Sequence, residues 1–248
     1  APMVLGVFAG DARQLSVSAS FPNLVALERN HGSLIRGMIA SRRKGQSNED
    51  PKGGLSGKLV SFRRGLQSVA VALAESDKFT VRCDTKVRKI EAITTAYGSS
   101  DRRPPRYRLL IDGVDSPIEA NAVVAAGEAF ANADAVKEVA PEVAMALREI
   151  TTPPVVVVAL GFQPQAALNF PTGFGVLIPR DQGYRTLGCI WDSQLFPGRS
   201  PKDHVLLRAM LGGSVDPHVA ELDDDSLIEL VSDELSRIFG LTSLPILS

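Results

Sequence analysis

Four consecutive valines between prolines and a glycine constrain this chain most. They lie in "TPPVVVVALGF", residues 152–162, where β-branched residues favour a strand. An unbroken apolar run is typical of a strand that is covered on both faces. Three further apolar segments follow at hairpin spacing, at 173–179, 185–193 and 204–213. The C-terminal half therefore predicts a sheet with strands at hairpin spacing.

Helical patterns surround these strands. Apolar spacing predicts helices at 21–30, 32–41 and 65–75, and a long helix over 223–239 that begins with three aspartates. Residues 132–150 read as two helices that Pro141 separates. Alternating residues predict strands at 79–83, 87–93, 106–113 and 118–126. The fold class is α+β: a mixed β-sheet domain with flanking helices.

Composition excludes several classes of function. The net charge is −1 over 248 residues, so the chain has no overall positive electrostatic field that would attract nucleic acid. The chain has two distant cysteines and three histidines without metal-ligand spacing, which excludes a typical zinc site and favours a reducing compartment. No run of about 20 apolar residues is long enough to span a bilayer. The glycine motifs of nucleotide cradles and the G-x-S-x-G nucleophile motif are also missing. The pattern favours a pocket with apolar walls that relies on a cofactor.

The hairpin at 173–199 contains the only tryptophan, Trp191. Its aromatic ring and flanking glycines suit the wall of an apolar binding pocket. The alternative is a core tryptophan packed between the sheet and a helix. Periodicity alone does not separate the two.

Four stretches together resemble one family. They are "GVFAGDARQLSVSASFPNLVALERNHGSLIRGMI" (6–39), "SFRRGLQSVAVAL" (61–73), "GFGVLIPRDQGYRTLGCIWDSQLFPGRSP" (173–201) and "VLLRAMLGG" (205–213). Their order and spacing are similar to those of the oxygen-dependent, FAD-containing protoporphyrinogen oxidases, within the flavin amine oxidase superfamily. The resemblance implies oxidation of protoporphyrinogen IX to protoporphyrin IX, with FAD as cofactor and oxygen as acceptor, in tetrapyrrole biosynthesis.

The resemblance also implies a domain layout. The expected fold is amine-oxidase-like, as part of a flavoprotein with two dinucleotide-binding domains. The N-terminal Rossmann unit of that flavoprotein is expected to be missing from this chain. Residues 1–57 would belong to a helical membrane-binding and substrate region, 58–150 to the FAD domain and 151–248 to the substrate-binding domain. The chain is thus expected to be an incomplete central portion that is inactive alone.

Site residues follow from the matched positions. The Val87 backbone would contact the FAD adenine. The porphyrinogen pocket would be lined by Gly10, Val158, Gly173, Phe174 and Trp191. No catalytic residue and no metal ligand is assigned.

Alternatives stay open. The chain is alternatively part of another flavin amine oxidase superfamily enzyme, such as a carotenoid desaturase, which has the same cofactor and a different substrate. A third reading is a tetrapyrrole-binding module that has no FAD and no enzymatic activity. Peripheral membrane contact and a homodimer are further partners that the resemblance allows. The expected location is the cytoplasm, beside the membrane, for a bacterial protein, or an organelle for a eukaryotic one.

Overall fold

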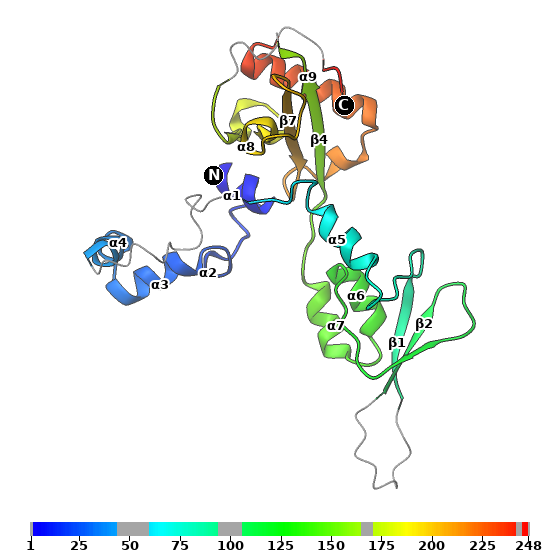
Figure 1. Ribbon diagram of the computed structural model, residues 1–248. Helices are drawn as coiled ribbons and strands as arrows, with labels where there is room; N and C mark the ends of the chain where they lie inside the picture. The colour runs from blue at the N-terminus through cyan, green and yellow to red at the C-terminus, as the bar shows by residue number, and fades with distance from the viewer. Residues whose placement is uncertain (1, 44–59, 94–105, 165–170, 242–244, 248) are drawn as a thin grey trace. The chain divides into compact units, whose positions relative to one another are not determined.

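The computed structural model describes residues 2–43, 60–93, 106–164, 171–241 and 245–247 (Figure 1). The chain divides into two compact units. Unit 1 consists of Ala1–Leu66 and Pro153–Ser248, and unit 2 of Gln67–Thr152. Both units combine helices with antiparallel strands, as the α+β reading predicts.

Unit 1 is built on a four-stranded antiparallel sheet of order β4-β7-β6-β5. Its elements are α1 (Pro2–Phe8), α2 (Val17–Ser20), α3 (Pro22–His31), α4 (Leu34–Arg43), β4 (Val155–Phe162), β5 (Gly175–Leu177), η2 (Arg180–Gln182), β6 (Thr186–Ile190), α8 (Asp192–Leu195), β7 (Val205–Gly212), η3 (Pro217–Glu221) and α9 (Asp224–Phe239). The predicted hairpin strands are confirmed as β5, β6 and β7, and the valine run as β4.

The long helix α9 covers one face of this sheet (Figure 1). The side chain of Asp223 accepts a hydrogen bond from the Ser226 N–H at 2.9 Å, so the predicted acidic start caps the helix. Gly240, at φ 67°, ends it in the left-handed conformation that glycine adopts without strain. The buried residues Val231 and Leu235 join the sheet in one hydrophobic core.

β4 is buried on one face only. Val156, Val158, Leu160 and Phe162 face the core, whereas Val157, between them, is 54% exposed. The prediction that both faces of the valine run are covered is therefore wrong for the described chain. The cause is the antiparallel layout, because α9 packs on a single side.

The helices at the N-terminus also follow the sequence prediction. α3 ends at Gly32, at φ 68°, and α4 begins two residues later. The two helices pack closely where Gly37 meets Leu27, since a Cβ at Gly37 would lie 3.0 Å from the Leu27 Cβ. Glycine therefore sets how closely the two helices approach.

Unit 2 combines a three-stranded antiparallel sheet of order β1-β2-β3 with helices. Its elements are α5 (Gln67–Ala74), β1 (Val87–Ile93), β2 (Arg106–Ile111), β3 (Ile118–Ala120), α6 (Ala129–Val136) and α7 (Pro141–Arg148). Pro141 opens α7, so the predicted break between two helices is confirmed. α6 packs against both β1 and α7.

Two predicted strands of unit 2 are absent or shorter than predicted. Residues 79–83 form no ladder, and Phe79 is 58% exposed. The strand predicted over 118–126 ends at Ala120, where its pairing with β2 ends. In both segments the apolar pattern is present, but no neighbouring strand among the described residues pairs with it.

Candidate substrate-facing site

The sheet face opposite α9 exposes apolar side chains on β4 and β5, whereas Gly188 of β6 is buried and Met210 of β7 is partly buried. The register aligns Val157 with Met210, Met210 with Gly188, and Gly188 with Leu177, so one row of side chains crosses all four strands. Cross-strand neighbours point to the same face, and Val157 and Leu177 are both exposed. This row, together with the exposed Val155, is called the open sheet face below. A flat apolar surface of this kind suits a broad apolar ligand or a protein partner.

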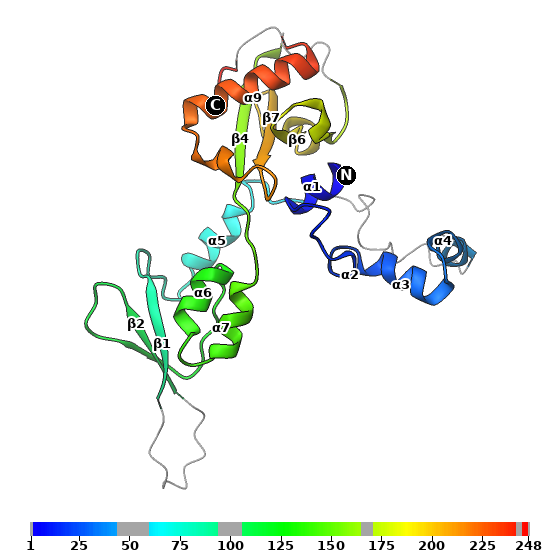
Figure 2. The same ribbon diagram turned by 180° about the vertical axis from the view of Figure 1, so that it is seen from behind.

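Helix α1 lies beside β5 and β6 (Figure 2). A methyl group at Gly6 would collide with the Leu177 side chain, and a Cβ at Gly188 would lie 3.1 Å from the same side chain. Leu177 therefore fits between two glycines, one on α1 and one on β6. This packing places α1 at one margin of the open sheet face.

The loop that contains Gly10 is fixed to the end of β7. The Ala9 carbonyl accepts a hydrogen bond from the Ser214 N–H at 2.8 Å, and Ala9 has φ 52°. A Cβ at Gly213 would lie 2.5 Å from the Ala9 oxygen, so glycine is needed for the close approach. Gly10 itself is buried against Leu15.

Gly10 lines a cavity of about 430 Å³ between this loop and the residues around η2. The cavity is lined by Leu5, Gly10, Asp11, Ala12, Arg13, Pro179, Arg180, Asp181 and Val215. Two arginines and two aspartates are among them, so its charges balance. Its volume is in the range of small-molecule pockets.

A buried carboxylate holds the chain beside this cavity. Glu234 of α9 is 4% exposed and accepts hydrogen bonds from the N–H groups of Arg185, at 2.7 Å, and Thr186, at 2.9 Å. These contacts fix the start of β6 to α9. Sequence reasoning missed Glu234; the signal was its helical spacing of three and seven residues from the apolar Val231 and Leu227.

Asp216 continues the polar network. It accepts hydrogen bonds from the Arg185 guanidinium at 2.8 and 3.0 Å and lies 3.6 Å from that of Arg180. The hydrogen bond from Arg185 lowers the pKa of the Asp216 carboxyl and raises the pKa of Arg185. Arg180 also donates to the Tyr184 carbonyl at 3.4 Å. The network therefore orients the cavity wall that carries Arg180.

The structure brings Gly173, Phe174 and Trp191 together. The backbone N–H of Trp191 donates to the Phe174 carbonyl at 3.1 Å, and the backbone N–H of Gly173 donates to the Gln194 side-chain oxygen at 2.9 Å. A Cβ at Gly173 would lie 3.0 Å from the Trp191 ring. Phe174 is exposed at this edge of the hairpin.

Trp191 and Val158 lie in the hydrophobic core. Trp191 is 5% exposed, and its ring meets that of Phe239 edge to face, with centroids 6.3 Å apart. Trp191 is therefore a core tryptophan packed between the sheet and a helix, which is the alternative to a pocket wall. Val158 also faces α9, whereas Val157 next to it faces the open side. The structure thus groups the hairpin residues and places Gly10 beside the end of β7.

Val87 lies in unit 2 as the first residue of β1. It is half-buried and opposite Ile111, and the ladder shifts register between Val87 and Lys89. The contact between the Val87 backbone and FAD stays a prediction, and the sequence has no glycine-rich turn that would cradle a pyrophosphate. The residues present therefore do not amount to a complete flavin site.

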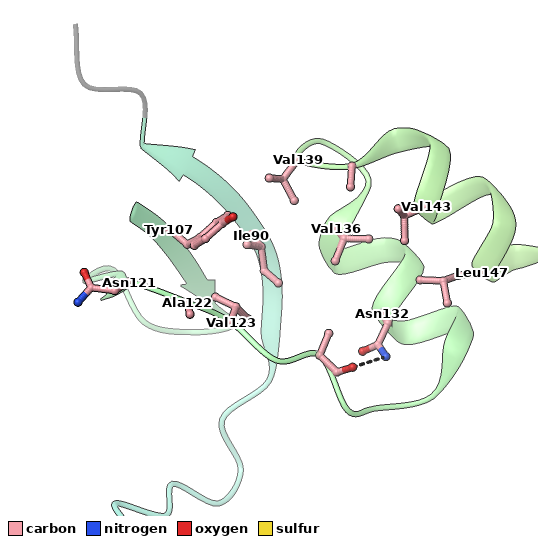
Figure 3. A pocket seen from close by; sticks show the side chains of 12 residues that line it. Ile90, Tyr107, Asn121, Ala122, Val123, Asn132, Val136, Val139, Val143 and Leu147 are labelled. Atoms are coloured by element: carbon pink, nitrogen blue, oxygen red, sulfur yellow. Dashed lines mark hydrogen bonds between the residues drawn. The ribbon is translucent and has the colours of Figure 1, made fainter. Parts of the chain in front are cut away.

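A second cavity, of about 610 Å³, lies within unit 2 between the sheet and helices α6 and α7 (Figure 3). Its lining is mostly aliphatic. It consists of Ile90, Tyr107, Asn121, Ala122, Val123, Ala125, Asn132, Val136, Val139, Ala140, Val143 and Leu147. It is called the unit 2 groove below.

In the described part of the chain, no group of three His, Cys, Asp or Glu side chains is placed to hold a metal ion. None of its helices is both long and apolar enough to cross a membrane.

Comparison with known proteins decides the family. The family of flavin containing amine oxidoreductases matches residues 1–246. The chain belongs to this family. The amine-oxidase-like fold expected from the resemblance is thereby confirmed, and so is the similarity to porphyrinogen oxidases that the relatives' names show.

Named relatives match nearly the whole chain. It is 31% identical to the chloroplastic protoporphyrinogen oxidase of Oryza sativa subsp. japonica, over 96% of this chain and 45% of that protein. It is 27% identical to the coproporphyrinogen III oxidase of Bacillus subtilis, over 98% of this chain and 49% of that protein. The crystal structure of a proposed protoporphyrinogen oxidase from Exiguobacterium sp. 255-15 matches with a TM-score of 0.70 at 27% identity, over 99% of this chain and 48% of that one. The chain spans about half the length of the curated relatives it matches.

Proposed function

We propose that this chain is the central portion of an FAD-dependent enzyme that oxidises protoporphyrinogen IX to protoporphyrin IX with oxygen as acceptor. The observation that carries the proposal is similarity along residues 1–246 to a flavin oxidoreductase family in which the matched relatives are named porphyrinogen oxidases. FAD, held mainly by segments outside this chain, would supply the oxidising chemistry. The residues of this chain would bind and orient the tetrapyrrole and exclude water.

The open sheet face supports a role in substrate binding. A porphyrinogen is broad and apolar, so it needs an extended apolar wall. Val157 and Leu177 supply exposed aliphatic surface. Phe174, at the hairpin edge, would add an aromatic contact, and Gly173 lets the backbone approach a flat ligand. Trp191 would act behind Gly173 by fixing its position.

The remaining assignments belong to the same proposal. Residues 1–57 would contribute to the helical membrane-binding region, 58–150 to the FAD domain with the Val87 backbone near the adenine, and 151–248 to the substrate-binding domain. The exposed apolar residues Ile35 and Met38 of α4 would face a membrane surface or further protein. The proposed location is the cytoplasmic side of a bacterial membrane.

Coproporphyrinogen III is a second candidate substrate. The relatives from Bacillus subtilis and Staphylococcus aureus, which are both 27% identical to the chain, carry the name coproporphyrinogen III oxidase. Coproporphyrinogen has propionates where protoporphyrinogen has vinyl groups. A site for it therefore needs additional cations or N–H donors.

A chimera tests the proposal. Residues 1–248 would replace the matching region of the Bacillus subtilis oxidase, whose own flanking segments would complete the flavin site. We expect the purified chimera to retain FAD and to form fluorescent porphyrin from protoporphyrinogen IX in the presence of oxygen. Faster turnover of coproporphyrinogen III would favour the second candidate. A flavin-loaded chimera that oxidises neither substrate would contradict the proposal.

The 248-residue chain alone provides the matched control. It should bind no stoichiometric FAD, and turnover by it would refute its status as an incomplete portion. If protoporphyrin IX quenches Trp191 fluorescence of the chain without flavin while the chimera is inactive, the non-catalytic tetrapyrrole-binding module becomes the better description.

A further inference from the structure

One cation lies on the sheet surface opposite α9. Arg208 of β7 stands between Leu207 and Ala209, which are both buried in the core that includes α9. Successive strand residues point to opposite faces. Arg208 therefore points to the side of the open sheet face, and its side chain is 41% exposed.

The register places Arg208 directly beside the open sheet face. Arg208 pairs with Ala159 on β4 and with Ile190 on β6, and Ile190 pairs with Gly175 on β5. This row is two residues along the strands from the row that contains Met210, a spacing of about 7 Å. Arg208 is the only charged residue in the two rows. A tetrapyrrole is broader than this spacing, so one that lies on the open sheet face reaches Arg208.

Asp192 holds the Arg208 side chain in place. The Asp192 side chain, at the start of α8, is 14% exposed and accepts a hydrogen bond from Arg208 Nη2 at 2.8 Å. The next residue, Ser193, accepts a hydrogen bond from the Leu206 N–H at 3.2 Å, which fixes α8 to β7. A side chain that is already ordered loses less conformational freedom when a ligand binds to it.

The Arg208 guanidinium is only partly satisfied by this contact. A guanidinium has five N–H donors, and Asp192 bonds to Nη2. The Nε atom is buried and has no acceptor in the described part of the chain. The row neighbours Ala159, Ile190 and Gly175 carry no side-chain acceptor. Arginine binds carboxylates through paired N–H donors, so a second carboxylate, from a ligand, suits this position.

We propose that Arg208 binds a propionate of the porphyrinogen while the macrocycle lies on the open sheet face, and that Asp192 is its positioning residue. A porphyrinogen combines an apolar ring with carboxylates at its edge. The sheet combines an apolar row with one cation in the neighbouring row. The inference rests on the proposed function and names the residue of this chain that recognises the charged part of the substrate.

Porphyrin binding tests this contact. Arg208→Met removes the charge and keeps an aliphatic stem. Arg237→Met is the matched control, because Arg237 lies on α9, on the other side of the sheet, and its side chain is 63% exposed. The ligands are coproporphyrin III and its tetramethyl ester, which has the same ring without carboxylates. Fluorescence anisotropy of the porphyrin measures the affinity of each ligand for the chimera and for the 248-residue chain.

We expect R208M to weaken the binding of coproporphyrin III by about tenfold, as for one lost charge-assisted hydrogen bond, and to leave the binding of the ester unchanged. R237M should change neither affinity. Unchanged binding of coproporphyrin III by R208M would overturn the proposal. Equal losses for the acid and the ester would also overturn it, as would a wild type that binds neither.

A double variant separates the lost contact from a new repulsion. R208M leaves the Asp192 carboxylate without its partner, and this charge could itself repel a propionate. The variant R208M/D192N removes that charge as well. It should bind coproporphyrin III as weakly as R208M does, and recovery of wild-type affinity would contradict a direct contact with Arg208.

Turnover by the FAD-loaded chimera identifies the propionate. A KM that R208M raises for coproporphyrinogen III alone assigns the contact to a propionate that protoporphyrinogen IX lacks, and a rise for both substrates assigns it to a shared one. A lower kcat with both KM values unchanged would count against a binding role. The anisotropy measurement does not depend on turnover. An inactive chimera that still prefers the acid through Arg208 would contradict the enzymatic function and leave this site standing, whereas an active chimera insensitive to R208M would overturn the site alone.

Discussion

Replacing Glu234 by alanine should destabilise unit 1 far more than a surface substitution on the same helix. The Glu234 carboxylate accepts two backbone hydrogen bonds, at 2.7 and 2.9 Å, while it is 4% exposed. Hydrogen bonds to a charged group contribute about 1.5–3 kcal/mol each, and the Glu234→Ala variant leaves both N–H groups unpaired. Releasing a buried carboxylate from its desolvation penalty offsets part of that loss. The net expectation is a loss of about 3 kcal/mol in the free energy of unfolding.

Urea unfolding followed by Trp191 fluorescence measures this loss. Trp191 is the only tryptophan of the chain and lies in the core that contains α9, so its emission reports on unit 1. Asp233→Ala is the control, because Asp233 is exposed and its ion pair with Arg237, at 3.6 Å, contributes about 0.5 kcal/mol or less. A difference between the two variants of less than about 1 kcal/mol would refute the role given to Glu234.

Two further predictions concern the same unit. Gly213→Ala should lower the unfolding free energy by about 2–4 kcal/mol, because the new Cβ would collide with the Ala9 oxygen. Gly183→Ala is the control, since Gly183 has a similar φ of 78° and no atom within 4 Å of a Cβ. It should lower the unfolding free energy only by the backbone strain of about 1–2 kcal/mol. Similar urea midpoints for the two variants would show that close packing of Gly213 against Ala9 does not contribute to stability. Asp216→Asn should lower the unfolding free energy by about 2 kcal/mol near neutral pH, because it loses the charged pair with Arg185. Folding lowers the pKa of Asp216. The ionised Asp216 therefore contributes its full stabilisation to the folded state above the unfolded-state pKa of about 4, and this stabilisation is lost as the pH falls through the folded-state pKa. Denaturation between neutral pH and pH about 3 should therefore show the gap between wild type and variant closing at low pH; a gap independent of pH would contradict the pairing.

Elements whose partners are close in sequence were predictable. The hairpin strands β5, β6 and β7 follow one another, so local pattern and turn spacing were sufficient. The start of α9 was predictable from Asp223, because a cap is a contact within one turn. Glu234 was not predictable in the same way. Its partners are nearly 50 residues away, and a glutamate in a helix is normally solvated.

The candidate site shows the same limit within one strand. The valine run identified β4, but the choice between Val157 and Val158 depends on which face α9 covers. Adjacent strand residues point to opposite faces, so a difference of one position moves a side chain from the core to the open sheet face. The four valines are alike, and the signal lies after them: the large Leu160 and Phe162 alternate with Ala159 and Gly161, which points to Val158 for the core.

The mistaken expectations have one physical cause. Val157, Phe79 and Val124 were all predicted to be covered or paired, and each is more than half exposed in the described chain. Val157 lies on the open sheet face, and Val124 belongs to the segment that borders the unit 2 groove. Apolar residues accumulate where a folded protein buries them, and soluble proteins rarely leave large contiguous apolar surfaces uncovered. If the chain is the central portion proposed above, the neighbours that would cover these residues belong to the remainder of the family fold, since the chain spans about half the length of its relatives.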